Sequence, residues 1–217
     1  MSEQRRGPGG ALTDRRCPPL SARARRLVDG TSLLETLIAL TLLGVLAMYG
    51  ASTMLRWRQQ QRLEGALRHL AHAVTRTCAL AVASGRIHGL RFVSASGELR
   101  WTTLVDGDGD GIGQADFAAG IDVPLDAEVT LGRRHAGIEP GRPPGAPTVL
   151  GGAADRGGLA FGPADIVSCT PSGSARSGTL YVRSRRGDGA ALRLYGPTAR
   201  MSLWWWRRTT GVWRRAS

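Results

Sequence analysis

The stretch Gly30-Thr31-Ser32-Leu33-Leu34-Glu35, with the apolar run behind it, decides how this chain is organised. Residues 33–55 read LLETLIALTLLGVLAMYGASTML, and Glu35 is their only charge. About 20 apolar residues are enough for a helix to cross the hydrocarbon core of a bilayer, so the run predicts a transmembrane helix. A carboxylate within it costs on the order of 2.5–3.5 kcal/mol at mid-membrane and less near an end. Glu35 therefore needs a partner, and the run contains no cation.

A newly formed α-amino group would be such a partner. Cleavage after Gly30 would make Thr31 the first residue and Glu35 the fifth. Residues four apart lie on the same face of a helix. In a bundle of such helices, the amine of one subunit would then meet the carboxylate of its neighbour at the same depth.

This arrangement resembles the start of a type IV prepilin or a type II secretion pseudopilin: a basic leader ending in Gly, then an apolar helix with Glu at its fifth position. The resemblance implies cleavage after Gly30 by prepilin peptidase, N-methylation of Thr31 and filament assembly through Glu35. The family usually has Phe or Met where this chain has Thr31. An ordinary signal anchor is the alternative, whereas a cleaved secretory signal would have a shorter apolar region of roughly 7–15 residues.

Composition places one modest domain behind this anchor. The chain has 217 residues, of which 42% are hydrophobic, and a formal net charge of +12 carried entirely by Arg. Residues 1–30 hold seven Arg and three acids, so the chain without them keeps 22 Arg against 14 acids, or +8. Arg23, Arg25 and Arg26 before the apolar run favour a cytoplasmic N-terminus. No pattern of catalytic residues stands out, and we expect the protein not to be an enzyme.

Beyond the membrane run, the periodicity first continues as helix and then changes to strand. Leu63, Leu67, Leu70, Val74, Thr77 and Ala81 form one stripe at helical spacing, and Ser84-Gly85 is the expected stop. Strands are expected over 87–93, 98–105, 123–131, 158–161, 179–184, 190–195 and 199–206. The Gly- and Pro-rich residues 132–157 are expected to form a long surface loop. A long N-terminal helix packed on an antiparallel β-sheet domain is α+β architecture.

The second half also resembles the GspH/FimT group of minor pseudopilins, over roughly residues 31–205 in all. Thr75–Ser84 is similar to the family's helix end, and Gly89–Val93 to the strand after it. Trp101–Gly111 is similar to a strand running into an Asp/Gly turn, and 158–161 and 177–180 are similar to late strand motifs.

Asp106-Gly107-Asp108-Gly109-Asp110-Gly111 is the one motif of a metal-binding kind. Asp at loop positions 1, 3 and 5 with Gly at 6 matches the start of a calcium-binding EF-hand loop. The bidentate acid at position 12 is missing, since Phe117 stands there. An acidic turn without metal is preferred, with Ca²⁺ as the alternative and no other cofactor expected.

His69 and His72 share a helix face and are interpreted as solvated side chains, not zinc ligands.

Two cysteines follow the membrane run, Cys78 and Cys169, and outside the cytoplasm such a pair can form a disulfide. Two separate buried thiols are the alternative. Cys17 lies in the leader.

The C-terminal residues combine aromatic and basic side chains. Two arginines follow directly after Trp204-Trp205-Trp206, and two more follow Trp213. With Arg200 they make five candidate contacts for DNA or a partner: Arg200, Arg207, Arg208, Arg214 and Arg215. Arg beside aromatic rings is typical of single-stranded nucleic acid binding, and equally of a membrane interface. Some relatives in the resembled family bind DNA through a Gly-Arg-x-Arg motif, of which Ala199-Arg200-Met201-Ser202 keeps only the first Arg.

Together these observations predict a leader (1–30), a transmembrane helix (31–55), its amphipathic continuation (56–85), a periplasmic β domain (86–206) and a basic tail (207–217). We expect a minor pseudopilin of a type II secretion system, single-pass in the bacterial inner membrane, with other pseudopilins and prepilin peptidase as partners. The alternative is a type IV pilus minor pilin that contacts DNA for uptake.

Overall fold

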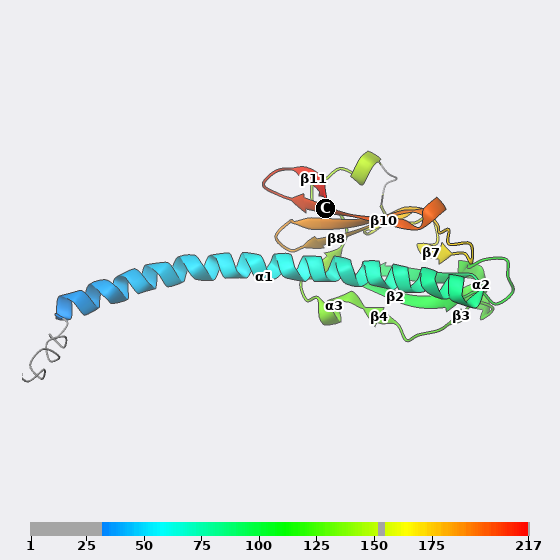
Figure 1. Cartoon of the computed structure of the whole chain (residues 1–217), viewed down its shortest axis with the longest axis horizontal. Coiled ribbons are helices and arrows are strands. Elements are labelled where there is room, and N and C mark those ends of the chain that lie inside the picture. The colour runs from blue at the N-terminus through cyan, green and yellow to red at the C-terminus, as the bar shows by residue number, and fades with distance from the viewer. Residues whose placement is uncertain (1–31, 152–154, 217) are drawn as a thin grey trace, which may run out of the picture. The chain divides into compact units, whose positions relative to one another are not determined.

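The computed structural model describes residues 32–151 and 155–216 and has the expected α+β architecture (Figure 1). The chain divides into two compact units, Met1–Ala51 and Ser52–Ser217. Helix α1 (Leu33–Ser84) begins in the first unit and ends in the second. The predicted leader, with Gly30, Thr31 and Cys17, lies outside the described residues.

The described part of the first unit is an apolar helical segment whose large side chains are all exposed. Leu33–Gly50 has a mean hydropathy of 1.9 and no buried residue. The hydroxyls of Thr36 and Thr41 donate to the backbone carbonyls of Leu33 and Ile38, at 2.9 and 2.8 Å. Because these bonds satisfy the hydroxyls within the helix, the two threonines are compatible with a lipid environment.

The rest of α1 contributes one face to the core of the second unit. All six residues of the predicted stripe are buried, from Leu63 at 3% exposure to Ala81 at 0%, and Thr77 among them is 1% exposed. The Thr77 hydroxyl donates to the Ala73 carbonyl at 2.9 Å, so its burial leaves no unpaired hydroxyl hydrogen. Gly85 follows the last turn with φ +68°, a conformation that favours glycine, and its N–H bonds to the Ala81 carbonyl.

Two antiparallel sheets lie in this unit. The first has the order β3-β2-β1-β7, with β4 also paired to β2. Its strands are β1 (His88–Ala95), β2 (Glu98–Val105), β3 (Val123–Pro124), β4 (Val129–Thr130) and β7 (Ile166–Cys169). The β1–β2 hairpin turns at Ser96-Gly97, and its register places Phe92 opposite Trp101.

The second sheet has the order β11-β10-β9-β8-β5, with β6 also paired to β8. Its strands are β5 (Ile138–Pro140), β6 (Leu159–Ala160), β8 (Gly178–Ser184), β9 (Gly189–Tyr195), β10 (Arg200–Arg207) and β11 (Val212–Arg215). Short helices α2 (Gln114–Ala119) and α3 (Leu131–Arg134) and the 3-10 turns η1 (Val149–Gly151) and η2 (Gly196–Thr198) occupy the connections.

One core joins the helix to both sheets. Leu67 and Leu70 of α1, Leu90 of the first sheet, and Leu180 and Leu192 of the second are each at most 1% exposed and belong to a single cluster. Burial of large apolar side chains at roughly 1.5–3 kcal/mol each is the main source of stability for such a layered fold.

The prediction of a surface loop over 132–157 was wrong. This segment contains the end of α3, strand β5 and turn η1, and its Val149 packs with Tyr181 and Ala191 in a second small core on the other face of the second sheet. The Val149 N–H bonds to the Tyr181 hydroxyl at 3.0 Å, inside the protein. The described residues 132–151 include ordered elements because this part of the chain covers aromatic side chains that the sheet would otherwise expose to water.

The single strand expected over 123–131 was also wrong. Only Val123–Pro124 and Val129–Thr130 pair with β2, and Leu131 begins α3. Between them Asp126 accepts a hydrogen bond from Arg76 of α1 at 2.7 Å, and this contact lowers the pKa of the Asp126 carboxyl. Pro124 has no N–H for the ladder, which accounts for the early end of β3.

Candidate functional site

The apolar helix that opens the chain is the first candidate site, because it exposes a continuous hydrophobic surface. Leu33 and Leu46 are 81% and 68% exposed. Monomeric soluble proteins rarely expose contiguous apolar patches of this kind, which typically mark a membrane or protein interface. The helix is long and apolar enough for a single membrane span.

Glu35 lies in the first turn of α1, where a carboxylate is favoured by the helix dipole. Within residues 32–151 and 155–216, no cation forms an ion pair with it. The two residues that would complete the processing site, Gly30 and Thr31, lie outside the described residues. The structure therefore leaves the pairing of Glu35 with a neighbouring subunit as a proposal.

The acidic turn after β2 is held by its own backbone. Asp106 is 2% exposed, and its carboxylate accepts hydrogen bonds from the N–H groups of Asp108, Gly109 and Gly111, at 3.2, 2.7 and 3.0 Å. Asp122, 1% exposed, accepts from Gly107 at 3.4 Å and from Gly113 at 3.0 Å. Two buried carboxylates thus accept hydrogen bonds from five backbone donors, and no sequence motif points to the second carboxylate, Asp122.

The same turn also brings together three carboxylates that satisfy the oxygen chemistry of a calcium site. Oxygen atoms of Asp106, Asp108 and Asp110 lie within 4.8 Å of one another. A hydrogen bond with Asp108, followed by the negative charge of that residue, raises the pKa of Asp110. However, both oxygens of Asp106 already accept backbone hydrogen bonds, and residue 117 is Phe. The geometry favours an acidic turn whose first Asp is structural.

We expect Asp106→Ala to lower the free energy of unfolding by about 1–3 kcal/mol, because it removes the buried carboxylate to which three backbone N–H groups of the turn donate. The matched substitution of exposed Asp108 to Ala should change it by about 0.5 kcal/mol or less. Both variants are compared by thermal unfolding with and without about 1 mM Ca²⁺. A Ca²⁺-dependent rise in Tm that Asp108→Ala removes would show that the turn binds metal.

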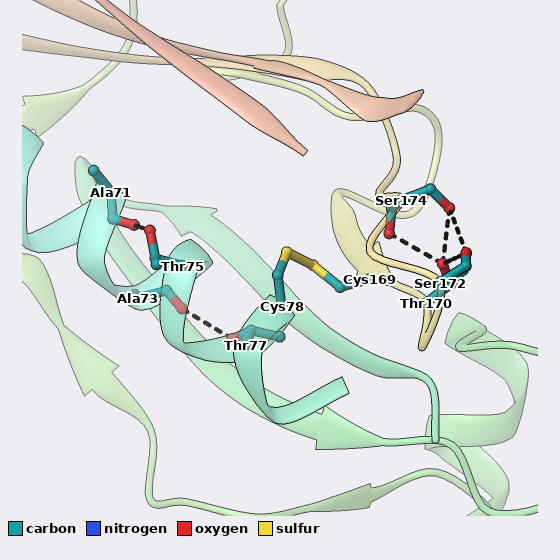
Figure 2. The surroundings of a disulfide bond; sticks show 9 residues. All are labelled: Ala71, Ala73, Thr75, Thr77, Cys78, Cys169, Thr170, Ser172 and Ser174. Atoms are coloured by element: carbon teal, nitrogen blue, oxygen red, sulfur yellow. Dashed lines mark hydrogen bonds between the residues drawn. A yellow bond between two sulfur atoms is a disulfide. The ribbon is translucent and has the colours of Figure 1, made fainter. Parts of the chain in front are cut away.

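The structure joins Cys78 to Cys169, so the alternative of two separate thiols does not hold (Figure 2). The sulfur atoms are 1.96 Å apart and the Cα atoms 4.9 Å apart. The bond ties the last turns of α1 to edge strand β7, and the Cys169 side chain is fully buried. Beside it, the hydroxyls of Thr170, Ser172 and Ser174 hydrogen-bond to one another. Since Cys78 is oxidised, it is unavailable to His69 and His72 as a zinc ligand.

His69 is half-buried and not simply solvated as the sequence analysis expected. Its ring makes an edge contact with Trp101, with centroids 5.1 Å apart, and lies 5.6 Å from the ring of His135. Burial, and then the charge of a protonated His135, lowers the pKa of His69. The two histidine rings pack against each other, and no third metal ligand lies beside them among the described residues.

The C-terminal tryptophans pack against one another instead of presenting free ring faces. Trp206 is 7% exposed, and its ring centroid lies 5.5 Å from that of Trp213 on the neighbouring strand. The indole N–H of Trp213 donates to the Pro147 carbonyl at 2.8 Å, and that of Trp204 to the Ser202 hydroxyl at 3.1 Å. Trp204 and Trp213 pack, partly buried, against the second small core of Val149, Tyr181 and Ala191, which covers part of the ring surface that nucleotide bases would need.

The candidate arginines do not form one cluster. Arg200 begins strand β10 and Arg207 ends it, which separates them by about 23 Å. Arg214 and Arg215 lie in β11, so the expected basic tail is in part an edge strand paired to β10. Gly211, at φ +62° in the Thr209-Thr210-Gly211 turn, permits the hairpin of β10 and β11. This glycine is the sequence signal for the hairpin, which the expectation of a basic tail did not include.

No protein-family model, curated protein or solved structure matches the chain.

Proposed function

We propose that this chain is a minor pseudopilin, a structural subunit of a type II secretion pseudopilus in the bacterial inner membrane and periplasm. The observation that carries the proposal is the difference in exposure between the two parts of α1. Its first part exposes large apolar side chains around Glu35, and one face of its continuation is buried in a two-sheet unit. A subunit that packs by an N-terminal helix and displays a folded unit needs both parts.

In this proposal, prepilin peptidase cleaves after Gly30 and the new N-terminus at Thr31 is methylated. The ammonium of one subunit pairs with Glu35 of the next, and the exposed leucines of the helices pack together. Before assembly the same helix anchors the subunit in the inner membrane, and the residue 52–217 unit lies in the periplasm. The disulfide supports this placement, since stable disulfides are typical of oxidising compartments.

The alternative, a type IV pilus minor pilin that contacts DNA, has one observation in its favour. Arg207, Arg208 and Arg214 are exposed, and the described residues supply no acid that pairs with them. Against it, the nearby tryptophan rings pack on each other, so the combination of basic and stacking groups that single strands require is incomplete.

The proposal is tested by filament composition. Cells that assemble a type II pseudopilus from an abundant major subunit should yield sheared filaments containing this chain at low stoichiometry. The same preparation from a strain without prepilin peptidase should contain none. Recovery of the chain in membranes but never in filaments would reject the assignment as a filament subunit.

A further inference from the structure

A groove of about 550 Å³ lies at one end of the residue 52–217 unit, between α1 and the turns of two hairpins. Gln59, Gln60 and Leu63 of α1 form one wall. The other wall contains Arg186 of the β8–β9 turn, and Trp205, Trp206, Arg207 and Arg214 of the β10–β11 hairpin. The two hairpin turns touch, because the Arg208 N–H donates to the Asp188 carboxylate at 3.3 Å.

We propose that this groove and its arginines, the basic end of the unit, dock on the anionic phospholipid headgroups of the membrane that holds α1. The inference rests on the proposed function only for the membrane anchor, and it adds a surface to which that function assigns no role. It gives the subunit a resting state on the membrane before filament assembly.

Charge is the first argument. Arg186, Arg207, Arg208 and Arg214 at the basic end make no ion pair within residues 32–151 and 155–216. The acids nearby are already engaged. Glu64 pairs with Arg68 at 2.6 Å, and Asp188 accepts the backbone hydrogen bond from Arg208. The free guanidinium groups are therefore available to anionic headgroups, whose phosphates they bind in a bidentate manner.

Chain length is the second argument. The candidate membrane span ends at Gly50, and Gln59 in the groove follows it by nine residues. Nine residues reach about 13 Å along a helix and no more than about 30 Å fully extended. The α1 wall of the groove therefore stays within this reach of the bilayer surface. Arg58 and Arg62, both exposed on the same turns of α1, add to its positive charge.

The aromatic residues are the third argument. Trp57 is 56% exposed only seven residues after Gly50, and Trp205 and Trp206 line the groove itself. Tryptophan is enriched at the interface between lipid and water, where its amphipathic ring lies at the level of the headgroups, and neighbouring arginine adds attraction to anionic lipid. This favours a lipid surface over nucleic acid as the occupant.

The test uses the full chain in nanodiscs of zwitterionic lipid, with and without about 30% phosphatidylglycerol, and measures hydrogen exchange of backbone amides across residues 205–214. We expect slower exchange in this hairpin with phosphatidylglycerol, reversed by high salt. Each basic side chain near an anionic surface changes the docking equilibrium roughly fivefold. Arg207→Ala/Arg208→Ala should weaken docking roughly twentyfold and abolish the protection.

The matched control is Arg176→Ala/Arg200→Ala, which removes the same charge from the opposite ends of β8 and β10 and should keep the protection. Equal exchange in both lipid compositions, with the chain inserted in each, would overturn the docking surface and leave the pseudopilin proposal standing. A chain that does not insert would overturn both. Protection by an added single-stranded oligonucleotide, but not by anionic lipid, would overturn lipid docking in favour of nucleic acid.

Discussion

Reduction of the Cys78–Cys169 bond should lower the free energy of unfolding of the residue 52–217 unit by about 2–5 kcal/mol. The bond closes a chain separation of 91 residues, and closing a loop of that length removes much of the conformational entropy of the unfolded chain. It also fixes short edge strand β7, whose four residues have few other ties to α1. This is the largest change in stability that we expect from a single modification.

The measurement is denaturant unfolding of the full chain in detergent, followed by tryptophan fluorescence with and without reductant. Cys78→Ala/Cys169→Ala should reproduce the reduced protein and no longer respond to reductant. Cys17→Ala is the matched control, because it removes a thiol outside the pair and should keep the full response. Three titratable thiols in the non-reduced protein, with unchanged stability on reduction, would disprove the bond.

Substitution of Glu35 by Ala should lower incorporation into filaments on the order of a hundredfold. A charge in the bilayer costs about 2.5–3.5 kcal/mol, and in the proposed packing Glu35 offsets that cost for the N-terminus of its neighbour. Without the carboxylate, the neighbour's ammonium is left unpaired in an apolar surrounding. Membrane insertion of the single chain should not change.

The readout is the amount of this chain in sheared filaments relative to the amount in membranes. Thr41→Ala is the matched control, since it removes a polar group of the same helix that bonds only to the Ile38 carbonyl, and it should assemble as the wild type does. Glu35→Ala assembling at the wild-type level would show that the carboxylate has no part in subunit packing.

The helix and the main strands could be predicted from the sequence because local patterns specify them. The stripe from Leu63 to Ala81 matches one helical face, and all of it is buried. The expected strand over 98–105 coincides with β2, and the β1–β2 hairpin turns where its Ser and Gly residues stand. Alternation of residues over a strand and a glycine after a helix act within a few residues.

The remaining elements depend on contacts between distant residues and have no such local pattern. Strand β7 has four residues and forms because β1 offers it an edge. The segment 141–151 is ordered by Tyr181 and Trp213, which follow it by more than 30 residues. The disulfide was left open for the same reason, because only the fold brings Cys78 next to Cys169. Likewise, burial of Asp122 beneath the acidic turn has no signature in the sequence.

The candidate surface at the C-terminus changed most between sequence and structure. The five candidate arginines and four tryptophans do not form one surface, because the length of β10 separates Arg200 from the rest, and Trp204 and Trp213 pack against the second small core. The exposed arginines instead border a groove beside residues 59–63 of α1. This groove forms where the two hairpin turns pack near α1, so no local sequence pattern predicts it.

The intact mass of the chain, extracted from membranes of strains with and without prepilin peptidase, tests the proposed function most directly. A minor pseudopilin should yield a species that begins at methylated Thr31 when the peptidase is present, and the full-length chain when it is absent. Gly30→Leu, the matched variant, should stay full-length in both strains. A full-length wild-type chain in both strains would contradict the account, because Glu35 would then have no processed N-terminus to pair with.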